Sequence, residues 1–473
     1  MMEFLSEIHS KIYNHTNAVW CKIESHEYTY GDLKSFIQSY TPAVAQTSGP
    51  VGLVIRDDFE TYASIIACWM CGRSYVPIQP SYPDSRIKDI VELSEIQFYL
   101  DSQFQTLNIV GLKCITISNE EKAIESPPLN NQDLAYILFT SGTTGKPKGV
   151  PISFGNLQAF IEGFFDLGYE LNNNDKFLQM FELTFDLSVM SFCIPSILGA
   201  SFYPPSKKLI KPLALYDTLE SEEISFALMV PSAIDMLNPY ADEMELPYLK
   251  ISQFCGEALK IQQIRIWKVV CNSTQIDNVY GPTEATIYCT RYRVPPEIED
   301  CKHYNGIVCI GEPMTHVSLG LGNDKELYLG GTQTTLGYVK ANQSQKEAFF
   351  EHNNIWFYKS GDIGWRDKDE YYCLGRKDEQ VKIQGYRVEL AEIEFAAGKV
   401  FPNNKHKCVA LQSNSGCELH LVSKGVKTDD KLTEINSHLP WYMHIKQAHS
   451  LTEFPLNANG KVDKKQIILQ LGL

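Results

Sequence analysis

Short apolar runs alternate with amphipathic stretches between residues 50 and 280, and this alternation favours an α/β fold. The runs VGLVI at 51–55 and SYVPI at 74–78 predict buried strands, and residues 60–70 between them predict a helix. Together these three segments make one βαβ unit. The same order continues with predicted strands at 134–139, 225–230 and 276–280, and with predicted helices at 156–165 and 231–237.

The pattern changes near residue 305, after which short strands dominate. Predicted strands lie at 308–310, 317–319, 326–329 and 371–374, separated by Gly, Asn or Asp turn signals. The polar stretch RKDEQ at 376–380 marks the best domain boundary. Beyond it, the pattern predicts strands at 381–383, 409–411 and 419–422, and helices at 390–399 and 430–437. We therefore expect two domains, 1–376 and 377–473.

The composition is that of an ordinary globular chain, with 44% apolar and 21% charged residues. The net charge of −15 argues against a nucleic-acid partner, because such a partner needs a basic surface. No segment contains about 18 uninterrupted apolar residues, and the N-terminus lacks a signal-peptide pattern, so we expect no membrane insertion. The 13 cysteines are scattered and odd in number, which suits reduced thiols and a cytoplasmic location.

The segment TSGTTGKPKG at 140–149 directly follows a predicted buried strand. Its small residues let backbone N–H groups approach an anion, while its hydroxyls and lysines add donors and positive charge. The Walker pattern fails, because Pro147 follows Lys146. The loop is too long and too basic for an ordinary turn, so it predicts a phosphate site. The candidate contacts are Thr140, Ser141, Gly142, Thr143, Thr144, Gly145, Lys146 and Lys148.

This loop resembles the signature of the adenylate-forming superfamily, which comprises acyl-CoA synthetases, luciferases and amino-acid adenylation domains. Similar motifs follow in the order expected for that superfamily: GRSYVPIQPSYP from Gly72, FDLSV from Phe185, YGPTEAT from Tyr280, YKSGDIGW from Tyr358, GRKDEQVKIQGYRVELAEIE from Gly375, LPWYM from Leu439 and NANGKVDKK from Asn457. The resemblance implies an α/β (mixed α+β) fold. Residues 1–376 would form a large domain of αβαβα-type subdomains plus a small β-rich part, and 377–473 a small, mobile α+β domain.

Members of this superfamily activate a carboxylate with ATP, release pyrophosphate, and then pass the acyl group to a thiol. Two anions meet in the first step, so positive charge and a divalent metal must offset their repulsion. The resemblance implies that Glu284 is the Mg²⁺ carboxylate and that Thr283 is a phosphate-side hydroxyl. It further implies nucleotide contacts from Asn278, from Tyr280 packing on adenine, from Asp362 accepting the ribose hydroxyls, and from Arg376.

Lys461 in the NANGK motif resembles the catalytic lysine that bridges the substrate carboxylate and the α-phosphate. A mobile ammonium group suits charge that develops on two oxygens. In the family, the small domain that carries this lysine rotates between an adenylating and a thiol-transferring pose. The resemblance implies that Asp378 is the hinge and that Lys382, Gly385 and Tyr386 lie on the thiolation side.

Asp186 in FDLSV matches the aspartate with which amino-acid-activating members pair the substrate ammonium group. A buried carboxylate beside a cation would be well stabilised, and an ordinary helix N-cap is the alternative. The stretches around Asp186, Cys255 and Ser153 look most like D-alanine–carrier-protein ligases, which implies a small side chain. The implied substrate-binding residues are Asp186, Leu187, Met190, Leu228, Gln253, Cys255, Gly256, Val279, Ile287 and Tyr288.

The sequence contains no Gly-Gly-x-Ser phosphopantetheine site, so we expect the thiol on a separate carrier protein. The amino acid stays open, because one methylene changes discrimination by only about 1–3 kcal/mol. An L-prolyl or other amino-acid carrier-protein ligase of a natural-product (nonribosomal peptide) pathway would share every catalytic residue named above. An acyl- or aryl-CoA ligase would not need Asp186. A binding module without catalysis would not need the phosphate loop together with Glu284, Asp362 and Lys461.

Overall fold

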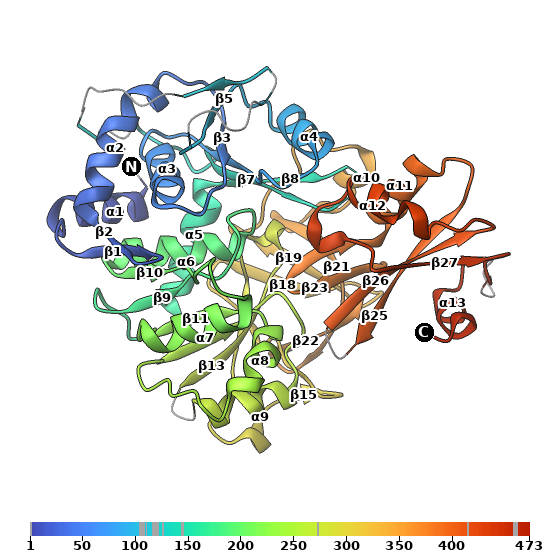
Figure 1. Ribbon diagram of the computed structural model, residues 1–473. Helices are drawn as coiled ribbons and strands as arrows, with labels where there is room; N and C mark the ends of the chain where they lie inside the picture. The colour runs from blue at the N-terminus through green and yellow to red at the C-terminus, as the bar shows by residue number, and fades with distance from the viewer. Residues whose placement is uncertain are drawn as a thin grey trace. The chain divides into compact units, whose positions relative to one another are not determined.

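The computed structural model describes residues 2–103, 109, 111–115, 123–124, 127–142, 146–271, 274–413, 416–456 and 462–473. The chain divides into two compact units, and Figure 1 labels many of their helices and strands. The larger unit comprises Met1–Ile78, Leu93–Leu138 and Gly149–Lys377. The smaller unit comprises Gln79–Glu92, Phe139–Lys148 and Asp378–Leu473.

A six-stranded sheet has the order β6-β5-β3-β4-β7-β8. Its strands are β3 (Val51–Val54), β4 (Tyr75–Ile78), β5 (Phe98–Leu100), β6 (Lys113–Cys114), β7 (Leu134–Thr140) and β8 (Lys148–Ser153). β3 pairs in parallel with β4 and β5. Helix α3 (Phe59–Met70) connects β3 to β4 and begins at Asp58, whose carboxylate accepts the N–H of Thr61. The expected βαβ unit is therefore present.

A nine-stranded sheet has the order β17-β14-β13-β12-β11-β9-β10-β1-β2. Its strands are β1 (Val19–Ile23), β2 (His26–Thr29), β9 (Lys176–Leu178), β10 (Ser201–Tyr203), β11 (Phe226–Met229), β12 (Ile251–Phe254), β13 (Gln275–Tyr280), β14 (Thr290–Arg293) and β17 (Glu312–Pro313). Strands β9 to β13 pair in parallel, whereas β14 and β17 add antiparallel strands at one edge.

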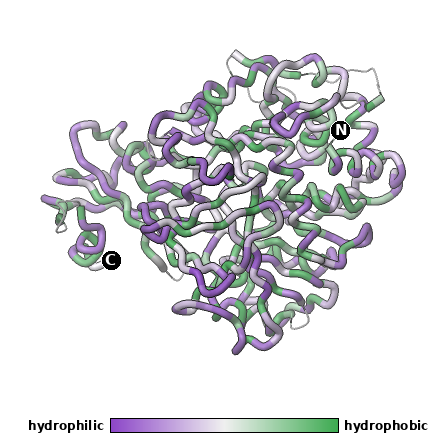
Figure 2. Tube along the Cα trace, turned by 180° about the vertical axis from the view of Figure 1, so that it is seen from behind, coloured by the Kyte–Doolittle hydropathy of each residue, from purple (hydrophilic) through white to green (hydrophobic). Residues whose placement is uncertain are grey.

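Helices cover both faces of the nine-stranded sheet. Because side chains alternate along each strand, successive residues of a strand join the cores on opposite faces. On β11, Ala227 and Met229 join a core with α7 (Lys211–Ser221), α8 (Ser232–Leu237) and α9 (Ile261–Val270), which lie together in Figure 1. The other face, with Phe226 and Leu228, joins the main core of the larger unit. Helices of that core are α1 (Glu3–Asn14), α2 (Tyr30–Ala45), α3, α5 (Phe154–Asp166) and α6 (Asp186–Leu198). Hydrophobic (green) stretches run through the interior of this unit in Figure 2.

The β-rich part of the larger unit is a five-stranded antiparallel sheet, β18-β19-β21-β20 with β22 on β21. Its strands are β18 (Val317–Leu321), β19 (Glu326–Gly331), β20 (Phe349–His352), β21 (Ile355–Asp367) and β22 (Glu370–Arg376), with the short helix α10 (Gln343–Lys346) before β20. The strand expected at 308–310 is wrong in extent. β16 (Ile307–Val308), which pairs with β15 (His303–Tyr304), ends before the left-handed Gly311.

The smaller unit contains a hairpin of β23 (Gln380–Ile383) and β24 (Tyr386–Glu389), followed by α11 (Leu390–Val400). A three-stranded sheet of β25 (His406–Ser413), β26 (Gly416–Lys424) and β27 (Gln447–Leu451) packs with α11 and α13 (Lys464–Leu471), and α12 (Leu432–Asn436) packs with α11. Helix α4 (Asp84–Ser94) begins in this unit. Short 3₁₀ turns are η1 (Asn238–Tyr240), η2 (Thr283–Ala285), η3 (Ile298–Asp300), η4 (Asp429–Lys431) and η5 (Trp441–Met443). Within the described ranges, no helix combines the length and apolarity needed to cross a bilayer.

Candidate active site

Glu284 lies in the turn η2, just beyond the carboxyl end of the parallel strand β13, where α/β sheets commonly bind ligands. Its side chain is fully buried. The hydroxyl of Tyr338 donates to Glu284 Oε1 at 2.6 Å, and the hydroxyl of Tyr358 donates to the same oxygen at 3.0 Å. These neutral donors hold the carboxylate in one orientation, as a metal-binding oxygen requires.

The backbone after Glu284 is strained, because Thr286 and Ile287 have φ values of 56° and 72°, unusual for β-branched residues. Gln333 holds this segment: its buried Nε2 donates to the carbonyl oxygens of Ala285, Thr286 and Tyr288. Glycine is needed at 281, since a Cβ there would lie 2.4 Å from the Cα of Tyr288. The sequence does not predict a role for Gln333, because its hydrogen-bond partners lie 45 to 48 residues upstream and leave no local signal.

Asp186 is the first residue of α6 and is buried, with 6% of its surface exposed. Burial raises the pKa of its carboxyl group to about 6; hydrogen bonds from Thr283 and from the N–H groups of Leu187 and Ile287 oppose this rise, and the charge of Glu284 adds to it. Its Oδ2 atom has no hydrogen-bond partner among the described residues. A buried carboxylate with an unused acceptor is suited to binding a cation.

Tyr280, Asp362 and Arg376 form one hydrogen-bonded group. The hydroxyl of Tyr280 donates to Asp362 Oδ2 at 2.6 Å, and Nη1 of Arg376 donates to Asp362 Oδ1 at 3.0 Å. Asp362 and Arg376 face each other across β21 and β22. Asn278, on β13 with Tyr280, donates to the carbonyl oxygen of Cys309 at 2.8 Å. An ionised carboxylate has about four acceptor positions, so Asp362 keeps capacity for further donors.

The residues expected to line the substrate side-chain pocket lie together in the larger unit, on α6, on β11 to β13 and on the strained segment. Each is at most 6% exposed: Leu187, Met190, Leu228, Gln253, Cys255, Val279, Ile287 and Tyr288. Gly256 follows Cys255 with φ 89°. The strand register aligns Leu228 with Gln253, and Gln253 with Asp277, which places these three side chains on one face of the sheet.

The phosphate-loop residues Ser141, Gly142, Lys146 and Lys148 belong to the smaller unit. Ser141 Oγ donates to the carbonyl oxygen of Arg387 at 2.7 Å, and Lys148 Nζ lies 3.4 Å from Glu389 Oε1. The N–H of Gly142 donates to Glu392 at 3.4 Å. Thr140 ends β7 and its hydroxyl has no partner among the described residues. Lys146 Nζ lies 3.6 Å from Asp89 Oδ1. Thr143, Thr144, Gly145 and Lys461 lie outside the described residues.

The expected hinge residue directly precedes the β23–β24 hairpin, and the expected thiolation-side residues lie within it. Asp378 is exposed and accepts the N–H of Gln380 at 3.3 Å. Lys382 is exposed on β23, and Gly385 lies in the turn with φ 84°. Tyr386 is buried and stacks on Tyr442 with ring centroids 4.2 Å apart. The described residues that were predicted as site residues thus form two groups. The residues predicted to contact the nucleoside, Mg²⁺ and the amino acid lie in the larger unit, and those of the phosphate loop, the hinge and the thiolation side lie in the smaller unit.

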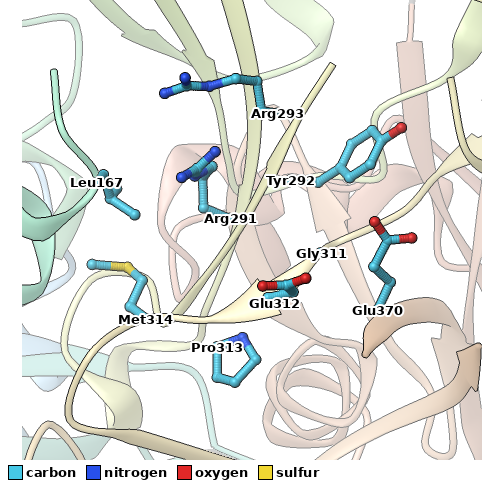
Figure 3. A pocket seen from close by; sticks show the side chains of 9 residues that line it. All are labelled: Leu167, Arg291, Tyr292, Arg293, Gly311, Glu312, Pro313, Met314 and Glu370. Atoms are coloured by element: carbon cyan, nitrogen blue, oxygen red, sulfur yellow. The ribbon is translucent and has the colours of Figure 1, made fainter. Parts of the chain in front are cut away.

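A metal site made only of protein ligands is not evident: no group of three or more His, Cys, Asp or Glu side chains lies together in the described part of the chain. Mg²⁺ commonly needs only one or two carboxylates when substrate phosphates supply the other oxygens. The buried, oriented carboxylate of Glu284 fits that requirement. A separate cavity of about 260 Å³, shown in Figure 3, lies beside β14 and β17 and is lined by none of the predicted site residues.

The sequence pattern described as "AMP-binding enzyme" matches residues 10–339. The chain is 32% identical over 446 residues to gramicidin S synthase 2 of Aneurinibacillus migulanus, covering 88% of this chain and 10% of that protein. It is 30% identical over 422 residues to the D-alanine–D-alanyl carrier protein ligase of Staphylococcus aureus, covering 85% of this chain and 86% of that protein. The chain thus spans about a tenth of the length of the gramicidin synthases that it matches.

Among solved structures, the Vibrio cholerae adenylation domain AlmE in complex with glycyl-adenosine-5'-phosphate is similar, with a TM-score of 0.86 and 25% identity. The alignment covers 100% of this chain and 98% of that chain. The fold is thus that of an adenylation domain, with a large N-terminal and a small C-terminal domain, and the expected mixed α/β class is confirmed. The chain belongs to the AMP-binding enzyme family, which confirms the resemblance to adenylate-forming enzymes and agrees with the expected AMP-forming ligase.

Proposed function

We propose that the chain activates a small, D-alanine-like amino acid with ATP and then transfers the aminoacyl group to the phosphopantetheine thiol of a carrier protein. The observation that carries this proposal is the buried Asp186, with a pKa of about 6 and an unused acceptor oxygen among the described residues. The ammonium group of an amino acid would supply both the missing charge and the missing donor. Fatty and aryl acids carry no such group.

In the first step, a carboxylate oxygen of the amino acid attacks the α-phosphorus of ATP. A phosphorus–oxygen bond forms, and the bond from phosphorus to the leaving pyrophosphate breaks. We assign Asp186 to the ammonium group, and Tyr280 with Asp362, Arg376 and Asn278 to the nucleoside. Glu284, beside Thr283, would hold Mg²⁺, which supplies positive charge against the phosphates. Ser141, Lys146 and Lys148 with the rest of the loop would bind those phosphates, and Lys461 would neutralise charge on the reacting oxygens.

In the second step, the thiol sulfur attacks the carbonyl carbon of the aminoacyl-adenylate. A carbon–sulfur bond forms, the bond from the carbonyl carbon to the phosphate oxygen breaks, AMP leaves, and the thiol proton passes to solvent. We assign Lys382, Gly385 and Tyr386 to this step and Asp378 to the hinge. The name of the Staphylococcus aureus relative, a carrier protein ligase, supports a carrier protein as the acceptor. The glycyl-adenosine-5'-phosphate complex of the Vibrio cholerae adenylation domain supports an aminoacyl-adenylate intermediate.

The decisive experiment is amino-acid-dependent exchange of labelled pyrophosphate into ATP, measured across D- and L-amino acids and glycine. We expect exchange with a small amino acid, and AMP release with aminoacyl transfer when a phosphopantetheinylated carrier protein is supplied. Exchange with none of the amino acids contradicts the proposal. Activity with only fatty or aryl acids and coenzyme A contradicts the assignment of Asp186 and favours a CoA ligase instead.

A further inference from the structure

A chain of hydrogen bonds runs from the substrate pocket into the nine-stranded sheet. The hydroxyl of Tyr288 donates to Gln253 Oε1 at 3.1 Å, and Gln253 Nε2 donates to the hydroxyl of Tyr169 at 2.7 Å. The hydroxyl of Tyr169 then donates to Asp277 Oδ2 at 2.5 Å. Each hydroxyl proton is thereby committed to one acceptor, so the donor and acceptor roles along the chain are fixed in one direction.

The fold sets all four of these residues in place. Gln253 and Asp277 are register partners on the parallel strands β12 and β13, and both are completely buried. The ring of Tyr288 packs edge-on against Phe160 of α5, with centroids 5.0 Å apart. Tyr169 follows α5 and packs on Phe164 of that helix at 5.4 Å. A buried hydrogen-bond network of this kind holds its side chains in one arrangement.

Positively charged side chains stabilise the carboxylate of Asp277, which is the last acceptor of this series of hydrogen bonds. Gln275 Nε2 donates to Asp277 Oδ2 at 3.0 Å, and Nε of Arg293 lies 3.7 Å from Asp277 Oδ1. Figure 3 shows Arg291 and Arg293 on the same side of β14, with Tyr292 pointing the opposite way. Burial raises the pKa of Asp277, while the Tyr169 hydroxyl and then the two arginines act against that rise. Asp277 is thus a fixed acceptor for Tyr169.

We infer that Tyr169 and Asp277 are positioning residues that hold Gln253 and Tyr288 across the space for the substrate side chain, so that the site favours glycine or alanine over larger amino acids. This inference rests on the proposed function and names its substrate class. Tyr288 and Gln253 have no exposed surface, and Leu228, Cys255 and Val279 have at most 2%. Because buried side chains are close-packed, a substituent larger than a methyl group would have to displace one of them.

A larger side chain would therefore have to displace the Tyr288 ring. Displacing the ring breaks its hydrogen bond to Gln253 and leaves a buried amide oxygen without its donor, which is costly in a dry environment. Neither the ring nor the amide can turn to another partner independently, because Gln253 is held from its other side by Tyr169. The hydrogen bonds through Gln253 and Tyr169 thus hold the Tyr288 ring in a fixed position.

The test compares kcat/KM for glycine, D-alanine, L-alanine, 2-aminobutyrate and valine in the exchange reaction of the full chain. We expect the better of glycine and alanine to exceed 2-aminobutyrate by about tenfold or more. Tyr288→Ala should reduce that ratio by about tenfold, and Tyr169→Phe by about threefold to tenfold. Asp277→Asn keeps an acceptor for Tyr169 and should retain the wild-type ratio, whereas Asp277→Ala should not. Tyr216→Phe, which removes an exposed hydroxyl on α7, is the matched control.

Melting temperatures of all variants separate selectivity from simple loss of stability. Tyr169→Phe and Asp277→Ala variants that melt lower yet keep the wild-type ratio overturn the inference, and so does a wild-type preference for 2-aminobutyrate or valine. Those outcomes leave the proposed amino-acid activation standing. Absence of exchange with every amino acid overturns the proposed function, and the inference with it.

Discussion

The hydroxyl of Tyr280 donates a 2.6 Å hydrogen bond to Oδ2 of Asp362, and Arg376 donates to the other oxygen of the same carboxylate. The pair joins β13 of the nine-stranded sheet to β21 of the β-rich sheet. Tyr280 thereby has two functions in the proposed site: its ring offers an apolar face for adenine, and its hydroxyl orients the acceptor for ribose.

Removing the Tyr280 hydroxyl should raise the KM for ATP more than it lowers kcat for adenylate formation. Tyr280→Phe keeps the ring and loses one bond to Asp362, so we expect the KM for ATP to rise about threefold to tenfold. Asp362→Asn also loses the charge that pairs with Arg376 and should raise that KM further. Pyrophosphate exchange at varied ATP concentration measures both effects. Tyr304→Phe, at an exposed tyrosine, is the control, and an unchanged KM in both variants would contradict the assignment.

Activity should fall in acid because Asp186 must be ionised to bind an ammonium group. The folded-state pKa of about 6 is raised from 3.8, mainly by burial. We therefore expect kcat/KM for the amino acid to decrease about tenfold per pH unit below pH 6. A profile that stays flat down to pH 5 would exclude Asp186 from substrate binding.

The pH dependence of folding stability provides a control, because the contribution of Asp186 to stability should fall as the pH rises whereas activity should increase. A carboxyl group with a raised folded-state pKa stabilises the fold while it is protonated, and this contribution is lost as the pH rises through about 6. Asp186→Asn should therefore raise the free energy of unfolding above pH 7, by up to about 3 kcal/mol from the size of the shift, while it abolishes exchange. Thermal unfolding at pH 5 and pH 8 without substrate measures this difference.

Gln333 should be essential for the geometry of residues 285–288 although it touches no proposed substrate group. Gln333→Ala leaves three buried carbonyl oxygens without their donor and should cost about 2–4 kcal/mol of stability. We also expect a lower kcat, because this segment directly follows Glu284 and includes Tyr288. Chemical denaturation and exchange kinetics provide the measurements. Gln343→Ala, at an exposed glutamine of α10, should leave both unchanged.

Glu284→Gln should raise the Mg²⁺ concentration that gives half-maximal exchange by about tenfold or more, because the amide lacks the charge of the carboxylate. Removal of Mg²⁺ with EDTA should abolish wild-type exchange, and added Mg²⁺ should restore it. Tyr338→Phe removes one of the hydroxyls that orient Glu284 and should give a smaller shift in the same direction. Equal Mg²⁺ dependence in wild type and Glu284→Gln would exclude Glu284 as the ligand.

Lys461→Ala should reduce adenylate formation by about a hundredfold or more, with little change in ATP binding, because in the proposed mechanism its charge would act on the reacting oxygens. Exchange kinetics and equilibrium binding of ATP separate the two effects. Lys465→Ala, at an exposed lysine of α13, serves as the control. Wild-type exchange rates in Lys461→Ala would remove this residue from the mechanism.

Local pattern predicted the parallel strands β3, β4, β7, β11 and β13, because burial on both faces makes such strands continuous apolar runs. It did not predict α1, α2 or α6. The strands at 51–54 and 75–78 and the helix at 59–70 lie within a residue or so of the predicted segments. Family motifs located Asp186, Glu284 and Asp362. Tyr169, Asp277 and Gln333 were not predicted as site residues, since a hydrogen bond between distant residues leaves no periodicity in sequence. The strained φ of Ile287 is equally invisible, because propensity would place a β-branched residue in a strand.

Three side chains that hydrogen-bond the turn at 283–288, those of Gln333, Tyr338 and Tyr358, come from later in the chain. Gln333 reaches back 45 to 48 residues, Tyr338 reaches Glu284 across 54, and Tyr358 across 74. Such contacts form only after long loops close. The entropy lost in closing a loop opposes folding until the hydrogen bonds have formed. The turn can therefore adopt its final shape only once β21 has joined β19. During refolding, nucleotide-binding competence should consequently appear after the parallel sheets, with the β-rich part as the last element that the site requires.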